Sequence, residues 1–117
     1  MREPIRRIEK PWGYELIFAH TDRYVGKVLH VDPHQALSLQ YHRVKDETLY
    51  LMAGSVELWV EEEGAMVKTT LSGGESYRIV PHTKHRMVAG DDGCDIVEVS
   101  TPELDDVVRL EDRYGRA

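Results

Sequence analysis

The sequence predicts an all-β fold, a single antiparallel barrel built from short strands. Segments of about four to eight residues with alternating apolar and polar side chains recur along the chain. Clusters of glycine, proline, aspartate and serine separate them, and nothing repeats at a fixed period. The chain has 117 residues, of which 41% are hydrophobic, and this suffices for one domain with one core. We therefore expect residues 1–117 to form one β-barrel domain.

A charged arm comes before the first expected strand. It covers residues 1–13 and ends in Lys-Pro-Trp-Gly, where proline and glycine interrupt regular structure. We expect Trp12 to dock on the barrel. A small barrel exposes sheet edges and apolar faces, which a two-fold dimer made by strand or arm exchange would cover. We therefore predict a homodimer, with this arm as the contact.

Alternation and turn residues define the expected strands in the rest of the chain. In residues 24–31, Val25, Leu29 and Val31 alternate with other partly apolar positions, which is typical of a strand covered on both faces. The acidic tip at 61–64 has the composition of a hairpin turn. The expected strands cover residues 14–18, 24–31, 48–53, 55–62, 65–71, 75–80, 85–89 and 95–101.

Glycines separate the later strands, and the chain then ends in a less regular tail. Gly54, a Gly-Gly pair at 73–74 and a Gly-Asp-Asp-Gly sequence at 90–93 mark the breaks. The tail at 102–117 has apolar residues at mixed spacing, so a short helical turn and a strand both stay open. We expect this tail to pack on the barrel.

Composition excludes several classes of function. The net charge of −6 and the pI near 5.5 argue against a nucleic-acid partner, because such domains usually carry a basic face. The only cysteine, Cys94, cannot form an intrachain disulfide, which is compatible with a reducing compartment. No stretch approaches the ~20 apolar residues of a membrane span. We expect a soluble, cytoplasmic protein without a membrane partner.

The clearest candidate site lies in residues 33–54. Gln40, His42 and Glu47 follow the order Q-x-H-x4-E at the end of one expected strand and the start of the next. Residues two apart in a strand point to the same face, so Gln40 and His42 can converge on one point. His85, which follows a Gly-Gly turn, a strand and a proline-containing corner, offers a fourth ligand. The pattern therefore indicates a metal site.

These residues resemble the two signature motifs of the cupin superfamily, G-x5-H-x-H-x3,4-E-x6-G and G-x5-P-x-G-x2-H-x3-N. Glu47 and Gly54 keep the E-x6-G spacing, and Gly74 and His85 keep the spacing of the second motif. Gln40 replaces the first histidine, and its amide can still donate a carbonyl oxygen. The resemblance implies a double-stranded β-helix, or jelly-roll barrel. The departures elsewhere are Val80, His82 and Ala89.

Further sequence elements narrow the resemblance. The Lys-Pro-Trp-Gly sequence, L-S-L-Q-x-H with Glu47, the His85-Arg86 pair and the R-x-E-D-x-Y-G-R ending are similar to the C-terminal cupin domain of type II mannose-6-phosphate isomerases. In that family the domain is commonly fused behind a mannose-1-phosphate guanylyltransferase, a half that this sequence lacks. Where the family commonly reads Q-M-H-H-H-R-A-E-H, this chain reads Q-Y-H-R-V-K-D-E-T, so its substrate can differ.

The resemblance implies an aldose-ketose isomerase that acts on a small sugar phosphate such as mannose 6-phosphate. A proton moves between C1 and C2 through an enediolate, whose charge a metal can stabilise. Mixed nitrogen and oxygen ligation suits one divalent ion of Zn, Mn, Fe, Co or Ni. The implied metal ligands are Gln40, His42, Glu47 and His85.

A phosphorylated sugar and a proton transfer need further groups. Guanidinium and ammonium groups bind phosphate, and a side chain with a tuned pKa must move the proton. The candidates for substrate binding are Lys84, Arg86 and Arg113, with Arg109 as a further phosphate ligand. The candidates for the catalytic groups are Lys27, His82 and Arg109, with Glu98 as another choice for the proton shuttle.

Two other classes of function stay open. A metal-dependent cupin oxygenase would consume oxygen with Fe(II) and would have an open, apolar pocket without a cluster of cations. A non-catalytic cupin that binds a sugar or another effector would be stabilised by its ligand without turnover.

Overall fold

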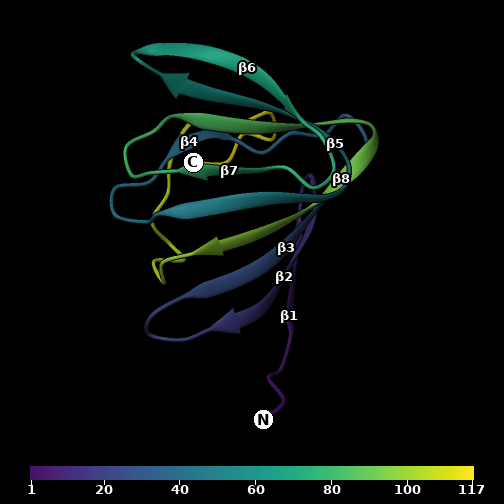
Figure 1. Ribbon diagram of the computed structural model, residues 1–117, viewed down its shortest axis with the longest axis vertical. Coiled ribbons are helices and arrows are strands. Elements are labelled where there is room, and N and C mark those ends of the chain that lie inside the picture. Colours follow the sequence, from purple (N-terminus) through teal and green to yellow (C-terminus); the bar gives the residue numbers. More distant parts are fainter.

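The computed structural model describes residues 1–117 and is built from β-strands without a helix (Figure 1). The predicted all-β fold is therefore confirmed. No helix that could cross a membrane is present. The strands are β1 Arg6–Lys10, β2 Gly13–His20, β3 Val25–Val31, β4 Leu39–Tyr41, β5 Glu47–Glu62, β6 Ala65–Leu71, β7 Ser76–Ile79, β8 His85–Ser100 and β9 Val108–Glu111.

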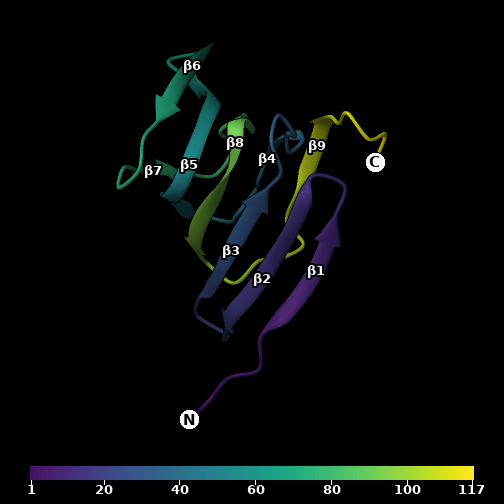
Figure 2. The same cartoon turned by 90° about the vertical axis from the view of Figure 1, so that its right-hand side faces the viewer.

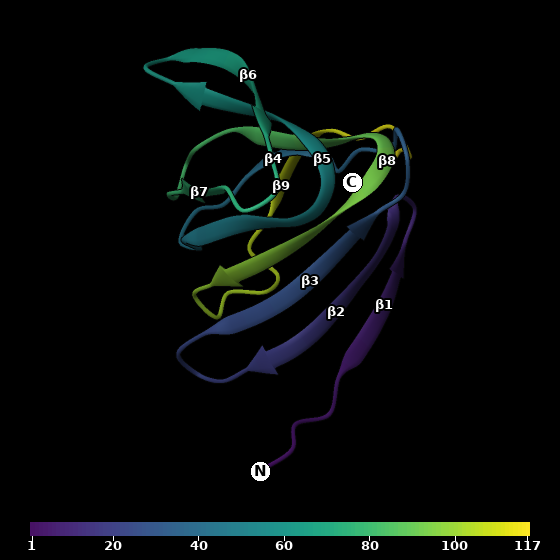
Figure 3. The same ribbon diagram turned by 45° about the vertical axis from the view of Figure 1, so that its right-hand side comes forward.

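Two long bent strands, β5 and β8, connect the two sheets of the barrel. The first part of β5 pairs with the last part of β8, from Glu47 opposite Ser100 onward. The last part of β5 pairs with the first part of β8, up to Val60 opposite His85. Figure 3 shows both strands curving from one sheet into the other. The strand orders are β1-β2-β3-β8-β5-β7 in the first sheet and β6-β5-β8-β4-β9 in the second.

Glycines permit the bend in these two strands. Gly54 has φ of +80°, and a Cβ placed on it would lie 2.1 Å from the carbonyl oxygen of Gly93, which itself has φ of +69°. The sequence predicted that strands end at Gly54 and at residues 90–93. The structure corrects this, because the glycines turn the strands through a bulge while pairing resumes on the far side.

The N-terminal arm is more regular than expected. Its residues 6–10 form β1, which pairs antiparallel with β2. Trp12, in the turn between the two strands, is 3% exposed and belongs to the core, so its predicted docking is confirmed. Because Trp12 lies in the core of its own chain, it is not free for the dimer contact that we expected of the arm. The homodimer itself stays a prediction.

The C-terminal tail contributes a strand rather than a helical turn. β9 pairs with β4, with Gln40 opposite Arg109. Beyond it, Tyr114 packs against the core, and its hydroxyl donates a hydrogen bond of 2.6 Å to the Gln35 side chain. These contacts place the tail against β4 and against the segment that precedes β4.

The barrel interior is divided into an apolar part and a charged part. The apolar core includes Leu29, Leu49 and Leu51, each at most 2% exposed. Burying charged groups costs free energy unless they are paired, so a charged interior indicates a functional site. The buried charged and imidazole side chains are Glu15, Lys27, His42, Lys45, Glu47, His85, Arg86 and Glu98.

Candidate metal centre

A cavity of about 360 Å³ lies between the two sheets. Its lining comes from β1, β2 and β3 of the first sheet, from β4 and β9 of the second, and from the shared strands β5 and β8. Seven of the eight buried charged and imidazole side chains named above face this cavity, and Arg86 does not. The polar part of the barrel interior is therefore one continuous site.

His42, Glu47 and His85 converge at the inner end of this cavity. One oxygen of Glu47, Oε1, lies 3.4 Å from Nε2 of His42 and 3.2 Å from Nε2 of His85. All three side chains are buried, and their ligand atoms lie within 4.8 Å of one another. His42 follows β4, while Glu47 begins β5 and His85 begins β8. Strands β5 and β8, which run through both sheets, thus bring residues that are distant in the sequence to one point.

The hydrogen bonds of the two histidines fix their tautomers. Nδ1 of His42 lies 2.6 Å from the carbonyl oxygen of Asp106, and Nδ1 of His85 lies 2.8 Å from that of Thr83. A carbonyl oxygen only accepts hydrogen bonds, so each Nδ1 carries a proton. In the neutral rings, both Nε2 atoms then present lone pairs to the Glu47 carboxylate.

A cation bound between the two imidazoles and the carboxylate would remove the repulsion between their lone pairs. Nε2 of His85 is buried without a hydrogen-bond partner. Two imidazole lone pairs and a carboxylate that face one another repel unless a cation lies among them, and ligating histidines usually donate their other N–H to a carbonyl or carboxylate. The group can therefore hold a metal ion. Gln40 stands opposite His85 between β4 and β8 and lines the same cavity, and its role as a fourth ligand stays a prediction.

The surroundings of Glu47 keep it ionised. Burial by itself would raise the pKa of Glu47, but His42 and His85, when their rings are protonated and donate Nε2–H to it, and the charge of Lys45 hold this pKa well below the usual value. In the metal-free protein a proton thus takes the place of the cation between the imidazoles and the carboxylate. A carboxylate that is already deprotonated is the form that binds a metal.

Lys45 is a site residue that sequence reasoning missed. It is 4% exposed, and its Nζ lies 3.1 Å from Glu47 Oε2 and 3.0 Å from Glu98 Oε2. The one signal for it was that the family motif also has a basic residue, arginine, at this position. A lysine two residues before a ligand in a polar loop otherwise resembles a solvated charge.

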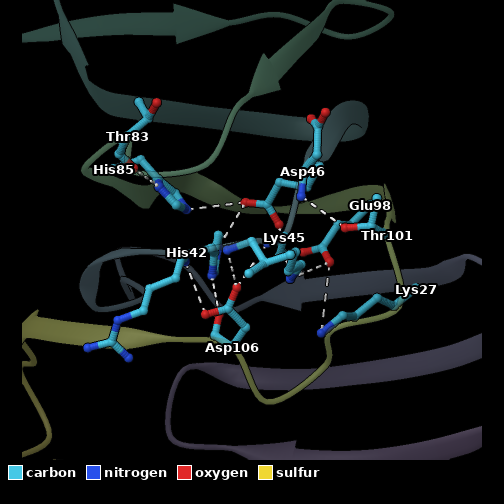
Figure 4. Close-up of polar contacts among 12 residues, drawn as sticks. Lys27, His42, Lys45, Asp46, Thr83, His85, Glu98, Thr101 and Asp106 are labelled. Atoms are coloured by element: carbon cyan, nitrogen blue, oxygen red, sulfur yellow. Dashed lines mark hydrogen bonds and ion pairs between the residues drawn. The ribbon is translucent and has the colours of Figure 1, made fainter.

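Alternating charges continue from Lys45 across the first sheet. Glu98 Oε2 lies 3.9 Å from Lys27 Nζ, which in turn lies 3.5 Å from Glu15 Oε2. Figure 4 shows the part of this series between His85 and Lys27. The charges of Glu98 and Glu47 outweigh burial and raise the pKa of Lys45. Burial, assisted by the charge of Glu47, raises the pKa of Glu98.

Asp106 organises the loop that carries these groups. Its carboxylate accepts hydrogen bonds of 2.7 to 3.0 Å from the backbone amides of Arg43, Val44 and Lys45. Although burial opposes it, these bonds lower the pKa of Asp106 to about 2. The carbonyl of the same residue accepts the Nδ1–H of His42. One tail residue therefore holds both the first histidine and the loop leading to Glu47, and nothing in the sequence pattern pointed to it.

Two of the other predicted site residues line the cavity. Lys27 projects from β3 beside Glu98, and Arg109 projects from β9. Nη1 of Arg109 donates to the backbone oxygen of Ala117 at 2.8 Å, while its Nε is buried without a partner.

The remaining predicted residues lie outside the cavity, which corrects our expectation of their position. Arg86 follows His85 on the same strand, so its side chain points the opposite way, and its Nε donates to the carbonyl of Leu37. His82 is exposed with φ of +66°, a turn conformation that sequence alone did not reveal. Lys84 and Arg113 are exposed as well.

A jelly-roll barrel with two histidines and a carboxylate at one interior point defines the chain as a cupin. The sequence from residue 2 to residue 112 matches the family described as "Mannose-6-phosphate isomerase C-terminal". The chain belongs to this family.

Several relatives are enzymes. The chain is 36% identical over 116 residues to the mannose-1-phosphate guanylyltransferase ManC of Salmonella typhimurium, and the match covers 95% of the chain and 23% of the relative. A guanylyltransferase of Escherichia coli K12 is 35% identical with the same coverage. The D-lyxose ketol-isomerase of Cohnella laeviribosi is 30% identical over 118 residues, covering 80% of the chain and 65% of that enzyme. The chain thus spans about a quarter of the guanylyltransferases it matches.

Solved structures support the fold. KdgF from a Halomonas species superposes with a TM-score of 0.72 at 22% identity, over 88% of this chain and 91% of KdgF. Oxalate decarboxylase from Bacillus subtilis superposes with a TM-score of 0.81 at 15% identity, over 91% of this chain and 30% of that one. At such identities the likeness concerns the fold alone.

Proposed function

We propose that the protein is a metal-dependent aldose-ketose isomerase that acts on a sugar phosphate, with mannose 6-phosphate as the first substrate to test. The observation that carries this proposal is that His42, Glu47 and His85 lie together in one cavity and that Glu47 connects through the buried Lys45 to a second carboxylate, Glu98. Membership of the mannose-6-phosphate isomerase family supports the reaction, and the ketol-isomerase among the relatives supports the reaction class.

One divalent ion would be held by His42, Glu47 and His85, with Gln40 as the fourth ligand. When bound, it supplies a Lewis acid that stabilises negative charge on the substrate oxygens. The ligand types suit Zn, Mn, Fe, Co or Ni. The B. subtilis oxalate decarboxylase, which shares the fold, has Mn(II) centres, so manganese belongs in the first loading experiments.

Glu98 is the proposed proton shuttle. In its ionised form it removes the proton from C2 and returns it to C1, while a second proton moves from the C2 hydroxyl to the C1 oxygen. Its raised pKa brings the carboxyl closer to the working pH, which favours acid-base catalysis. Lys45 lies between Glu98 and Glu47, where its ammonium group can donate a hydrogen bond to a substrate oxygen. Lys27 holds Glu98 from the other side.

The proposal is tested by a coupled assay for ketose formation. Protein loaded separately with each of the five metals is given mannose 6-phosphate, then a panel of hexose and pentose phosphates and free sugars. We expect turnover that a chelator abolishes and metal restores. His85→Ala should lose both metal and activity, whereas His82→Ala, which removes a nearby exposed imidazole, should keep both. Absence of turnover across the whole panel with metal-loaded protein would exclude the isomerase.

A non-catalytic sugar-binding cupin is the second candidate, because a cavity lined by buried cations and carboxylates can bind a sugar without turnover. Stabilisation by a sugar phosphate without turnover would support it. The oxygenase is less compatible with the cavity, because its lining is rich in lysine, arginine and carboxylate side chains rather than apolar ones.

A further inference from the structure

Two arginines that line the cavity form no ion pair with a carboxylate side chain, whereas the buried lysines of the cavity do. Lys27 and Lys45 each lie within 3.9 Å of two buried carboxylates, which neutralise them. Arg6, on β1, and Arg109, on β9, pair with no aspartate or glutamate side chain. Arg109 also has a buried Nε without a partner. The cavity therefore has a neutralised inner end and an outer end with unpaired positive charge.

Strand register connects each arginine to the proposed catalytic groups. In the second sheet, Arg109 stands opposite Gln40, and Gln40 stands opposite His85. Adjacent strands are about 4.8 Å apart, so this row places the Arg109 backbone roughly 10 Å from that of His85. A row of this length matches the scale of an extended sugar phosphate.

The first sheet contains a second row of residues on neighbouring strands, which also runs from a proposed catalytic residue to an arginine. Arg6 stands opposite Ile17, Ile17 opposite Lys27, and Lys27 opposite Glu98. All four line the cavity. Both sheets thus present a row that begins at a metal-site or acid-base residue and ends at an arginine. Figure 2 shows β1 and β9, which carry the two arginines, on the same right-hand side of the molecule, each at the edge of its own sheet.

The alternation along β1 supports an inward role for its cations. Arg6, Ile8 and Lys10 line the cavity, whereas Arg7 and Glu9 pair with each other on the outside. Lys10 forms an ion pair with Glu15 at 3.9 Å, so like Lys27 and Lys45 it is paired with a carboxylate, whereas Arg6 is not. The expected phosphate ligands Lys84, Arg86 and Arg113 do not line the cavity.

From these observations we propose that Arg6 and Arg109 form a subsite for the phosphate end of the substrate, while the carbonyl end lies at His42, Glu47 and His85. Guanidinium groups bind phosphate oxygens bidentately, and two of them that line one cavity match a phosphate monoester better than a neutral hydroxyl. The inference rests on the proposed function for its substrate. The subsite itself requires only that a phosphate binds.

A binding experiment tests the subsite without catalysis. Inorganic phosphate is titrated into metal-free protein by calorimetry, so that no metal competes for the anion. Arg6→Ala and Arg109→Ala should each weaken binding about tenfold or more, the loss of a charge-assisted hydrogen bond. Arg7→Ala and Arg113→Ala, which remove cations outside the cavity, should bind as the wild type does. Arg109→Lys should recover part of the affinity, because it keeps the charge and loses the fork.

Kinetics provide the second measurement. Arg6→Ala should raise KM for the phosphorylated sugar more than it changes kcat. Arg7→Ala, which removes the neighbouring cation outside the cavity, should leave the kinetics of both the phosphorylated and the unphosphorylated sugar unchanged. Arg6 is exposed on an edge strand, so this variant should fold even if Arg109→Ala loosens the tail. Phosphate binding that is absent, or equal in Arg6→Ala, Arg109→Ala and the wild type, overturns the subsite. Binding that depends on both arginines in a protein without isomerase activity supports the subsite and excludes only the proposed function.

Discussion

At the scale of single residues, Glu98 gives the proposed reaction its pH dependence. Its pKa lies above the usual value because it is buried and because Glu47 is close. A base must be ionised, so kcat/KM should fall as the pH is lowered through this raised pKa and should be constant above it. Glu98→Gln should lower kcat about a hundredfold or more and should remove this acidic limb.

A rate-against-pH profile from about pH 4 to 9 checks the prediction, with Glu75→Gln, on the exposed turn before β7, as the control. An acidic limb that persists unchanged in Glu98→Gln would assign the titration to another group.

The sequence predicted the metal residues better than their neighbours, for a physical reason. The grouping of His42, Glu47 and His85 was predictable because their spacing follows a strand pattern in which side chains two residues apart share a face, and their role as metal ligands stays a prediction. Arg86 and His82 were misplaced because the direction of a side chain depends on one residue of strand register or on one positive φ. Lys45 was missed because its burial results from Glu98, which is distant in sequence.

At the scale of elements, the bend of β5 depends on Gly54. Gly54 and Gly64 both have φ of +80°, but only Gly54 faces a backbone within 4 Å. Alanine at position 54 would be strained by the positive φ and would also clash with the Gly93 carbonyl. Gly54→Ala should therefore lower the free energy of unfolding by more than about 3 kcal/mol or prevent folding. Gly64→Ala should cost about 1 kcal/mol. Denaturant unfolding compares the two, and equal losses would show that the contact at the bend is unimportant.

The loop between β4 and β5 depends on Asp106 from the tail. Asp106→Ala removes three amide hydrogen bonds and loosens the segment that presents His42 and Glu47. Metal affinity should fall about 10- to 100-fold, as for other groups that orient metal ligands. Asp106→Asn should be intermediate, since its amide oxygen still accepts from part of the loop. Metal titration followed by calorimetry measures both, with Asp22→Ala, in an exposed turn, as the control. Wild-type affinity in Asp106→Ala would contradict this role.

The elements themselves were predictable to the extent that they are local. Alternation and turn residues located most strands, whereas continuation of β5 and β8 through their glycines depends on pairing between segments about forty residues apart. The strand β1 was missed because a charged edge strand buries few side chains, and its formation depends on pairing with β2.

At the scale of the whole molecule, metal binding should stabilise the fold. The metal-free barrel keeps two imidazole lone pairs and a carboxylate in close contact in its interior, an arrangement that a cation relieves. A ligand that binds only the folded state stabilises it by about 4 kcal/mol when its free concentration is 1,000 times Kd. For a chain of this length, that gain corresponds to a rise in Tm on the order of 10 °C or more.

Thermal unfolding with and without each divalent metal measures this coupling, and elemental analysis gives the metal content of protein purified without additions. The increase in Tm should be lost in His85→Ala and kept in His82→Ala. Because the ligands come from the loop after β4 and from the starts of β5 and β8, an ion held by them would connect both sheets at the inner end of the cavity. Its removal should therefore loosen β4 and β9 before the apolar part of the core, which hydrogen exchange can resolve. An equal increase in Tm for His85→Ala would mean that the metal acts elsewhere on this acidic chain.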